Sequence, residues 1–218
     1  MKMHKYVIIF LLTVFPALDF GYQVQGRVIN GTTERPLSHY PVALKIFHGQ
    51  EEQIVSVDTT DEAGHFLFTD LQEDGQYGAY LAYQMIKYDD IRWERPLPED
   101  HPLEITVYDT TRSDAHLKIA MQHTILQEGE GTLLVQQMMR VVNTGDKAFI
   151  GTVPVSQNAY KTLSFKLPGD ATNVRSGEGF MQCCVGLDQN GFYDTMEVLP
   201  REERCGVLLS DTSGGRLL

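Results

Sequence analysis

The side chains best suited to chemistry in this sequence are three cysteines near its carboxyl end, Cys183, Cys184 and Cys205. Cys183 and Cys184 are neighbours, so on a strand their thiols would point to opposite faces of a sheet. In an exported protein, Cys184 could form a disulfide with Cys205 across a hairpin, and Cys183 would then remain unpaired. Buried free thiols, or a metal or redox function, are the alternatives. The sequence contains no C-x-x-C and no C-x-x-C-H, which disfavours thioredoxin-like chemistry and haem attachment.

Metal binding is the second chemistry that the residue types suggest. The seven histidines are scattered, and none shows the short ligand spacing of a zinc site. Asp58, Asp61, Glu62 and Asp70 could supply oxygen ligands to calcium, but they lack the spacing of a calcium-binding loop and are typical of solvated turns. Methionines between residues 121 and 181 could suggest copper, although methionine more often fills a core. We therefore predict no metal site and no cofactor.

Four aromatic side chains suggest a surface that binds a ligand. Trp93, Tyr80, Tyr88 and Tyr40 could together form a surface on which a sugar or a peptide stacks, since Trp and Tyr combine an apolar ring with a polar tip. Alternatively, these rings cap the ends of a folded domain. The sequence contains no G-x-S-x-G, no phosphate-cradling glycine loop and no H-E-x-x-H. We therefore predict no catalytic residue and a protein that is not an enzyme.

Short strands must position these side chains. Ile54–Asp58 and His65–Thr69 alternate around a turn rich in Asp, Glu and Gly, which predicts a hairpin. Gly64 suits the positive φ of a tight turn, Asp61 can bond its amides, and the two phenylalanines of the second strand share one face. Similar runs recur at a spacing of about 8–12 residues and predict a β-sandwich over residues 22–109.

A second set of strand signals fills residues 114–218. Asp188–Gly191, between two alternating runs, is a typical hairpin turn, and the absence of helical periodicity predicts a second β-sandwich. After Pro200, segment 201–204 is highly charged, and segment 210–218 predicts a polar tail. The second sandwich would then lack one or more carboxyl-terminal strands.

Several of these motifs resemble the carboxypeptidase regulatory-like domain. They are G-x-V from Gly26, N-G-T from Asn30, P-L at Pro36, V-x-L from Val42, and T-x-x-x-G-x-F-x-F from Thr60. The resemblance implies a transthyretin-like (prealbumin-like) sandwich, also called a carbohydrate-binding-like fold, used as a scaffold or adhesive module of exported proteins. Segments 142–146 and 163–171 are similar to the Ig-like second half of exported bacterial proteins.

The amino terminus predicts export. Lys2 and Lys5 precede the apolar run Tyr6–Phe15, which has the length of a signal peptide and is too short to span a membrane comfortably. Cleavage after Ala17 and an uncleaved amino-terminal anchor both fit residues 1–21. Because no other long apolar run exists, attachment to a membrane would need that anchor or a lost carboxyl-terminal tail.

Composition and net charge limit the classes of partner that the protein can bind. The chain has 218 residues, of which 42% are hydrophobic and 22% charged, as in a globular protein. Its net charge of −11 disfavours nucleic acid and anionic membrane surfaces. We expect an all-β, non-enzymatic binding or structural protein of the periplasm or cell envelope, with a protein or glycan as partner. The alternatives are a carbohydrate-binding accessory protein that uses Trp93, and a metal or redox carrier that uses Cys183 and Cys184.

Overall fold

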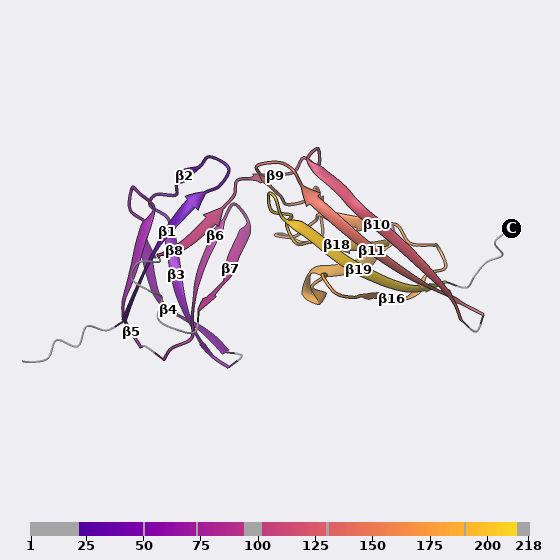
Figure 1. Cartoon of the computed structure of the whole chain (residues 1–218), viewed down its shortest axis with the longest axis horizontal. Helices are drawn as coiled ribbons and strands as arrows, with labels where there is room; N and C mark the ends of the chain where they lie inside the picture. The colour runs from indigo at the N-terminus through magenta and orange to yellow at the C-terminus, as the bar shows by residue number, and fades with distance from the viewer. Residues whose placement is uncertain are drawn as a thin grey trace, which may run out of the picture.

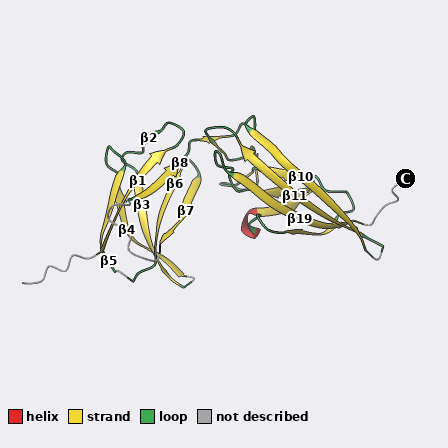
Figure 2. Ribbon diagram, in the orientation of Figure 1, coloured by secondary structure: helices red, strands yellow, loops and turns green. Residues whose placement is uncertain are grey.

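The computed structural model describes residues 22–49, 51–72, 74–93, 102–129, 131–189 and 191–212. Strands and their connections make up nearly all of this part of the chain, and its helical element is the short 3₁₀ turn η1 (Gln182–Cys184) (Figure 2). The all-β prediction is therefore confirmed. The predicted signal or anchor at residues 1–21 lies outside the described residues. Within them, no helix is long and apolar enough to cross a bilayer.

The amino-terminal unit consists of two sheets (Figure 1). In the first sheet, the central strand β1 pairs in an antiparallel sense with β5 and with the short β2, and in a parallel sense with β8. Its strands are β1 (Tyr22–Asn30), β2 (Arg35–Pro36), β5 (His65–Leu71) and β8 (Leu103–Val107). The second sheet is antiparallel and has the order β4 (Glu51–Thr59), β3 (Pro41–His48), β6 (Tyr77–Tyr83), β7 (Ile86–Trp93).

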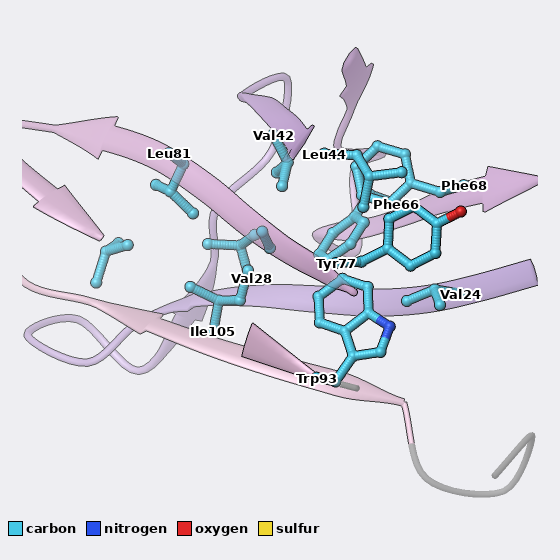
Figure 3. Close-up of a cluster of buried hydrophobic side chains, with 12 residues drawn as sticks. Val24, Val28, Val42, Leu44, Phe66, Phe68, Tyr77, Leu81, Trp93 and Ile105 are labelled. Carbon is cyan, nitrogen blue, oxygen red and sulfur yellow. The ribbon is translucent and has the colours of Figure 1, made fainter. Parts of the chain in front are cut away.

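Alternating side chains from both sheets form one core between them (Figure 3). Val24 and Val28 of β1 face Val42 and Leu44 of β3 because apolar residues recur at every second position of each strand. Burying such side chains stabilises the unit by roughly 1.5–3 kcal/mol each. This packing makes the amino-terminal unit sandwich-like.

The predicted hairpin between β4 and β5 is wrong. β4 pairs with β3, whereas β5 pairs with β1, so the connecting turn crosses from one sheet to the other. The turn itself has the predicted chemistry. Gly64 has a φ of 81°, and the Asp61 carboxylate accepts hydrogen bonds from the amides of Ala63 and His65 at 2.9 and 2.8 Å. Alternation sets which face of a strand is buried, but it does not say which sheet the strand joins.

The carboxyl-terminal unit also consists of antiparallel sheets. The larger sheet has the order β10 (Leu117–Glu128), β11 (Leu133–Asn143), β19 (Glu203–Thr212), β16 (Thr172–Ser176). The smaller sheet has the order β15 (Leu163–Phe165), β18 (Gly191–Asp194), β17 (Val185–Asp188), and β17 and β18 form the predicted hairpin at Asp188 and Gly191. A short ribbon joins β13 (Val153–Pro154) to β14 (Tyr160–Lys161).

The prediction of a polar tail over residues 210–218 is wrong as far as residue 212, because β19 runs from Glu203 to Thr212. β19 lies inside the larger sheet, between β11 and β16. Its charged beginning belongs to the fold because Arg204 is paired with the buried carboxylate of Asp194, and Leu208 further along the strand is buried. Residues 213–218 lie outside the described part of the chain.

Candidate functional site

Trp93 does not belong to an exposed stacking surface, so the prediction for this residue is wrong. Its side chain is only 8% exposed, and its ring centroid lies 6.2 Å from that of Tyr77 in the core (Figure 3). The register explains this position, because Trp93 on β7 lies directly opposite the inward-facing Tyr77 on β6. Trp93 is therefore not available to stack on a glycan, although the carbohydrate-binding alternative relied on this residue.

Tyr40 and Tyr88 follow the alternative, in which the rings cap the fold. The Tyr40 hydroxyl donates to the carbonyl of Ala82 at 2.6 Å, and its ring meets Tyr83 edge-on at 5.5 Å. The Tyr88 hydroxyl accepts a hydrogen bond from the amide of Tyr108 at 2.9 Å, and burial raises the pKa of Tyr88 to about 12. Both residues therefore stabilise the amino-terminal unit.

Tyr80 alone of the four predicted aromatic residues lies on an outer sheet face. The Lys45 ammonium group is 4.7 Å from the centroid of its ring and 3.0 Å from a carboxylate oxygen of Glu52. Close by in the sheet, the guanidinium group of Arg92 lies 4.3 Å from the ring centroid of Phe47. Cation–π contacts of this kind cover aromatic faces while keeping the charge near water.

The predicted disulfide between Cys184 and Cys205 is wrong, since all three cysteines are free thiols. Cys184 lies in η1, which leads into the smaller sheet, whereas Cys205 lies on β19 of the larger sheet opposite Arg140. The two residues are thus not cross-strand neighbours. Cys183 and Cys184 also do not diverge as they would on a strand, because they occupy a 3₁₀ turn, where their sulfur atoms are 2.8 Å apart.

The acidic residues around the β4–β5 turn bond the backbone. The Asp58 carboxylate accepts hydrogen bonds from the amides of Thr59 and Leu67 at 2.8 and 2.7 Å. The amide of His65 is the main cause that lowers the pKa of Asp61 below its ordinary value. These bonds agree with the interpretation of the acidic cluster as turn residues. Among the described residues, no group of three or more His, Cys, Asp or Glu side chains is placed to hold a metal ion.

The edge strand β4 is the best candidate for a binding site. It pairs with β3 on one side, and no further strand pairs with it in the described part of the chain. Eight of its nine residues are exposed, as the burial pattern of the strand shows, including Ile54 at 52%, Val55 at 47% and Val57 at 59%. An edge with free backbone groups and exposed apolar side chains is a template for another strand.

A sequence signal for this edge existed. Apolar residues occupy consecutive positions at Ile54 and Val55 and recur at Val57, so they cannot all face one core. A bulge also interrupts the alternation of inward and outward side chains along β4. The register shifts between Leu44 and Lys45 of β3, which leaves Val55 without a partner on β3.

The two units meet at a hydrogen-bonded junction. The Asp109 carboxylate accepts hydrogen bonds from Asn30 at 2.8 Å, from Tyr83 at 2.9 Å and from Gln84 at 3.1 Å. Directly after it, β9 (Thr110–Thr111) pairs in parallel with β12 (Ala148–Phe149) of the carboxyl-terminal unit. Asp109 is thus hydrogen-bonded to the amino-terminal unit, and β9, which follows it, is paired with the carboxyl-terminal unit.

Side chains and an open groove complete the junction. The Thr32 hydroxyl donates to the carbonyl of Asp146 at 2.8 Å, and the Arg112 guanidinium lies 3.7 Å from the ring centroid of Tyr160. A groove of about 920 Å³ runs between the units and is lined from both sides, by Glu34 and Tyr108 and by His116, Asp146 and Arg201 among others. Its lining mixes both charges and does not select one class of ligand.

No protein-family model matches the chain, and no match was found among curated proteins.

Proposed function

We propose that this chain is an exported, non-enzymatic binding protein of the cell envelope that holds a partner protein along the edge of β4. We also propose that the two units are separate domains, a carboxypeptidase regulatory-like sandwich and an Ig-like sandwich. The face-to-face sheets of the amino-terminal unit support this assignment, as does the core that the two sheets of the carboxyl-terminal unit share. Export is supported by the basic and apolar pattern at residues 1–21.

The exposure of β4 is the observation that carries the binding function. Its outer edge offers a row of backbone donors and acceptors, which an extended polypeptide satisfies better than a compact ligand. Ile54 and Val57 lie opposite Lys45 and Ala43 on the outer face of the sheet, so an added strand could cover them. A neighbouring strand would remove these apolar side chains from water at about 25 cal/mol per Å².

The charges around β4 select the chemistry of the partner. Glu51 and Glu52 lie at the start of the strand, Asp58 lies near its end, and Asp61 and Glu62 follow in the turn. Lys45 neutralises one of these five carboxylates. The occupant that fits is an extended segment with apolar residues in its centre and lysine or arginine at its ends. A second copy of this chain fits poorly, since each copy carries a net charge of −11.

The exposed strand β10 does not offer the same selectivity. Ile125 and Leu126 are exposed on it, but its ends carry Lys118 and Glu128, which have opposite charges. A basic segment would meet attraction at one end and repulsion at the other. β10 therefore serves as a matched control for an exposed apolar strand that lacks a single-sign charge.

Peptide binding tests the proposal. The probe is a fluorescein-labelled nine-residue peptide that alternates valine and threonine and carries two lysines at each end. We expect fluorescence anisotropy to show binding to the full chain, weakened at least tenfold by the double substitution Ile54→Lys and Val57→Lys. The double substitution Ile125→Lys and Leu126→Lys on β10 should leave the affinity unchanged, and a peptide with glutamates at its ends should bind more weakly.

Two results would contradict the proposal. One is a lysine-ended peptide that does not bind the unchanged protein at low salt, where charge attraction is strongest. The other is a peptide that binds the β4 variant as tightly as the unchanged protein. Circular dichroism of each variant confirms that the sheets persist, so that lost binding reports on the edge.

A further inference from the structure

The adjacent thiols of Cys183 and Cys184 are held together by their turn. Their sulfur atoms are 2.8 Å apart, with Cys183 exposed and Cys184 half-buried. The amide of Cys184 donates to the carbonyl of Met181 at 2.9 Å. Its own carbonyl accepts hydrogen bonds from the amide and the hydroxyl of Thr195, both at 2.8 Å. The backbone that carries the two thiols is thus fixed from both sides.

We propose that Cys183 and Cys184 form a reversible redox site, in which two-electron oxidation closes a disulfide between neighbouring residues. The oxidant is a disulfide of the glutathione class, RSSR. The Cys183 thiolate attacks one sulfur of RSSR, which releases one RS⁻ and leaves a mixed disulfide on Cys183. The Cys184 sulfur then attacks the Cys183 sulfur and releases the second RS⁻. Overall, two protein thiols and RSSR give one protein disulfide and two RSH.

The order of attack follows from exposure. Cys183 is open to solvent, so it can meet the oxidant first. Burial is the largest cause that raises the pKa of Cys184 to about 12, and the neighbouring Cys183 adds to it. A thiol with so high a pKa is a poor first nucleophile, but inside the turn it is held against the sulfur that it must attack. Its proton leaves with the departing thiolate.

The geometry also makes the bond easy to break. The sulfur atoms need to approach from 2.8 Å to about 2.05 Å, a small movement. Neighbouring Cα atoms are only about 3.8 Å apart, closer than the roughly 4.4–6.8 Å of ordinary disulfides. The ring formed by two adjacent residues is therefore strained, and strained, exposed disulfides are the readily reduced ones. The site is suited to switching rather than to stabilising the fold.

Mass spectrometry of the purified full chain tests this site. Trypsin should place Cys183 and Cys184 together in the peptide of residues 176–201, and Cys205 in the peptide of residues 205–216. After incubation with glutathione disulfide and alkylation in denaturant, we expect the first peptide to be lighter than its reduced form by two hydrogen atoms and to carry no alkyl group. The exposed Cys205 has no neighbouring thiol, so its peptide should end alkylated or as a mixed disulfide with glutathione, without an internal disulfide. Reduced glutathione in excess should restore both alkylation sites.

Variants separate this outcome from other thiol chemistry. Cys205→Ser should leave the result unchanged. Cys184→Ser should stop at a mixed disulfide between Cys183 and glutathione, whereas Cys183→Ser should leave Cys184 reduced and alkylated, because its half-buried thiol is the poor first nucleophile. A crosslink between the two peptides would overturn the proposal, as would a first peptide that stays doubly alkylated after treatment with glutathione disulfide. An internal disulfide that excess reduced glutathione fails to open would also overturn it.

Discussion

The guanidinium of Arg204 on β19 donates to the carboxylate of Asp194 on β18 at 2.8 Å, and this ion pair joins the two sheets of the carboxyl-terminal unit. The Asp194 side chain is 0% exposed and also accepts a hydrogen bond from the amide of Met196 at 3.1 Å. Burial is the largest cause that raises the pKa of Asp194, although Arg204 opposes the shift. The charged start of β19 therefore has a structural purpose.

Removal of Arg204 should destabilise the carboxyl-terminal unit. Arg204→Ala leaves the buried Asp194 carboxylate without its ionic partner, so we expect unfolding in urea to lose about 3–5 kcal/mol. Arg140→Ala is the matched control, because its ion pair with Glu203 joins side chains that are 40% and 52% exposed. An exposed pair contributes only about 0–1 kcal/mol. Equal losses for the two variants would contradict the structural role of the Arg204 pair.

Glu197 should make stability depend on pH. Burial is the largest cause that raises its pKa above the usual value of 4.5. A carboxyl group whose folded pKa is raised contributes stability that is complete below the unfolded pKa and is lost as pH rises through the folded pKa. Glu197→Gln keeps the neutral form at every pH. We therefore expect the variant to gain unfolding free energy relative to the unchanged protein as pH rises above 4.5.

Urea titrations between pH 4 and pH 7 measure this difference directly. The difference should level off once Glu197 is fully ionised in the folded protein, and Glu178→Gln provides an exposed control. A difference that stays constant with pH, or one that shrinks as pH rises, would contradict the raised pKa.

Trp93 is the single tryptophan of the chain, so its environment can be measured without interference. We expect blue-shifted emission in the native protein, weak quenching by acrylamide, and a red shift on unfolding. Trp93→Ala should cost about 3–5 kcal/mol, as for a large core side chain. Tyr80→Ala on the outer sheet face should cost less. Strong quenching in the native state would show that Trp93 is exposed after all.

Asp109 should couple the junction to the amino-terminal unit. Asp109→Ala removes a shared acceptor and leaves the buried amide of Asn30 with fewer partners, for an expected cost of about 1–3 kcal/mol. The pKa of Tyr83, which burial and Asp109 raise together, should fall. NMR titration of labelled tyrosine and urea unfolding measure the two effects. Asp114→Ala, at an exposed position after the junction, should change neither.

Local chemistry was predictable from the sequence, and long-range pairing was not. The turn at Asp61 and Gly64 and the inward faces of β5 and β6 follow from residue types within a few positions of one another. The partner of each strand depends on residues far along the chain. Alternation at β4 and β5 is therefore equally compatible with a hairpin and with a crossing between sheets.

The candidate sites were predicted least well for a related reason. Trp93 has the composition of a binding residue, but its register opposite Tyr77 places it in the core. The thiols of Cys183 and Cys184 approach each other because η1 replaces a strand, and no turn signal in Gln182–Cys184 indicates a 3₁₀ turn. Charge at the start of β19 suggested solvent exposure, because the sequence does not show that Arg204 meets Asp194.

The position of the final strand has a consequence for biosynthesis. β8 closes the amino-terminal sheet against β1, so that unit can finish folding as soon as Val107 is free of the ribosome. β19, in contrast, is the last strand in the described part of the chain and occupies the interior of its sheet. Until it emerges, β11 and β16 lack the strand that joins them. A chain made from its amino terminus would thus hold a folded leading half and a trailing half that stays open until the ten residues of β19 are made.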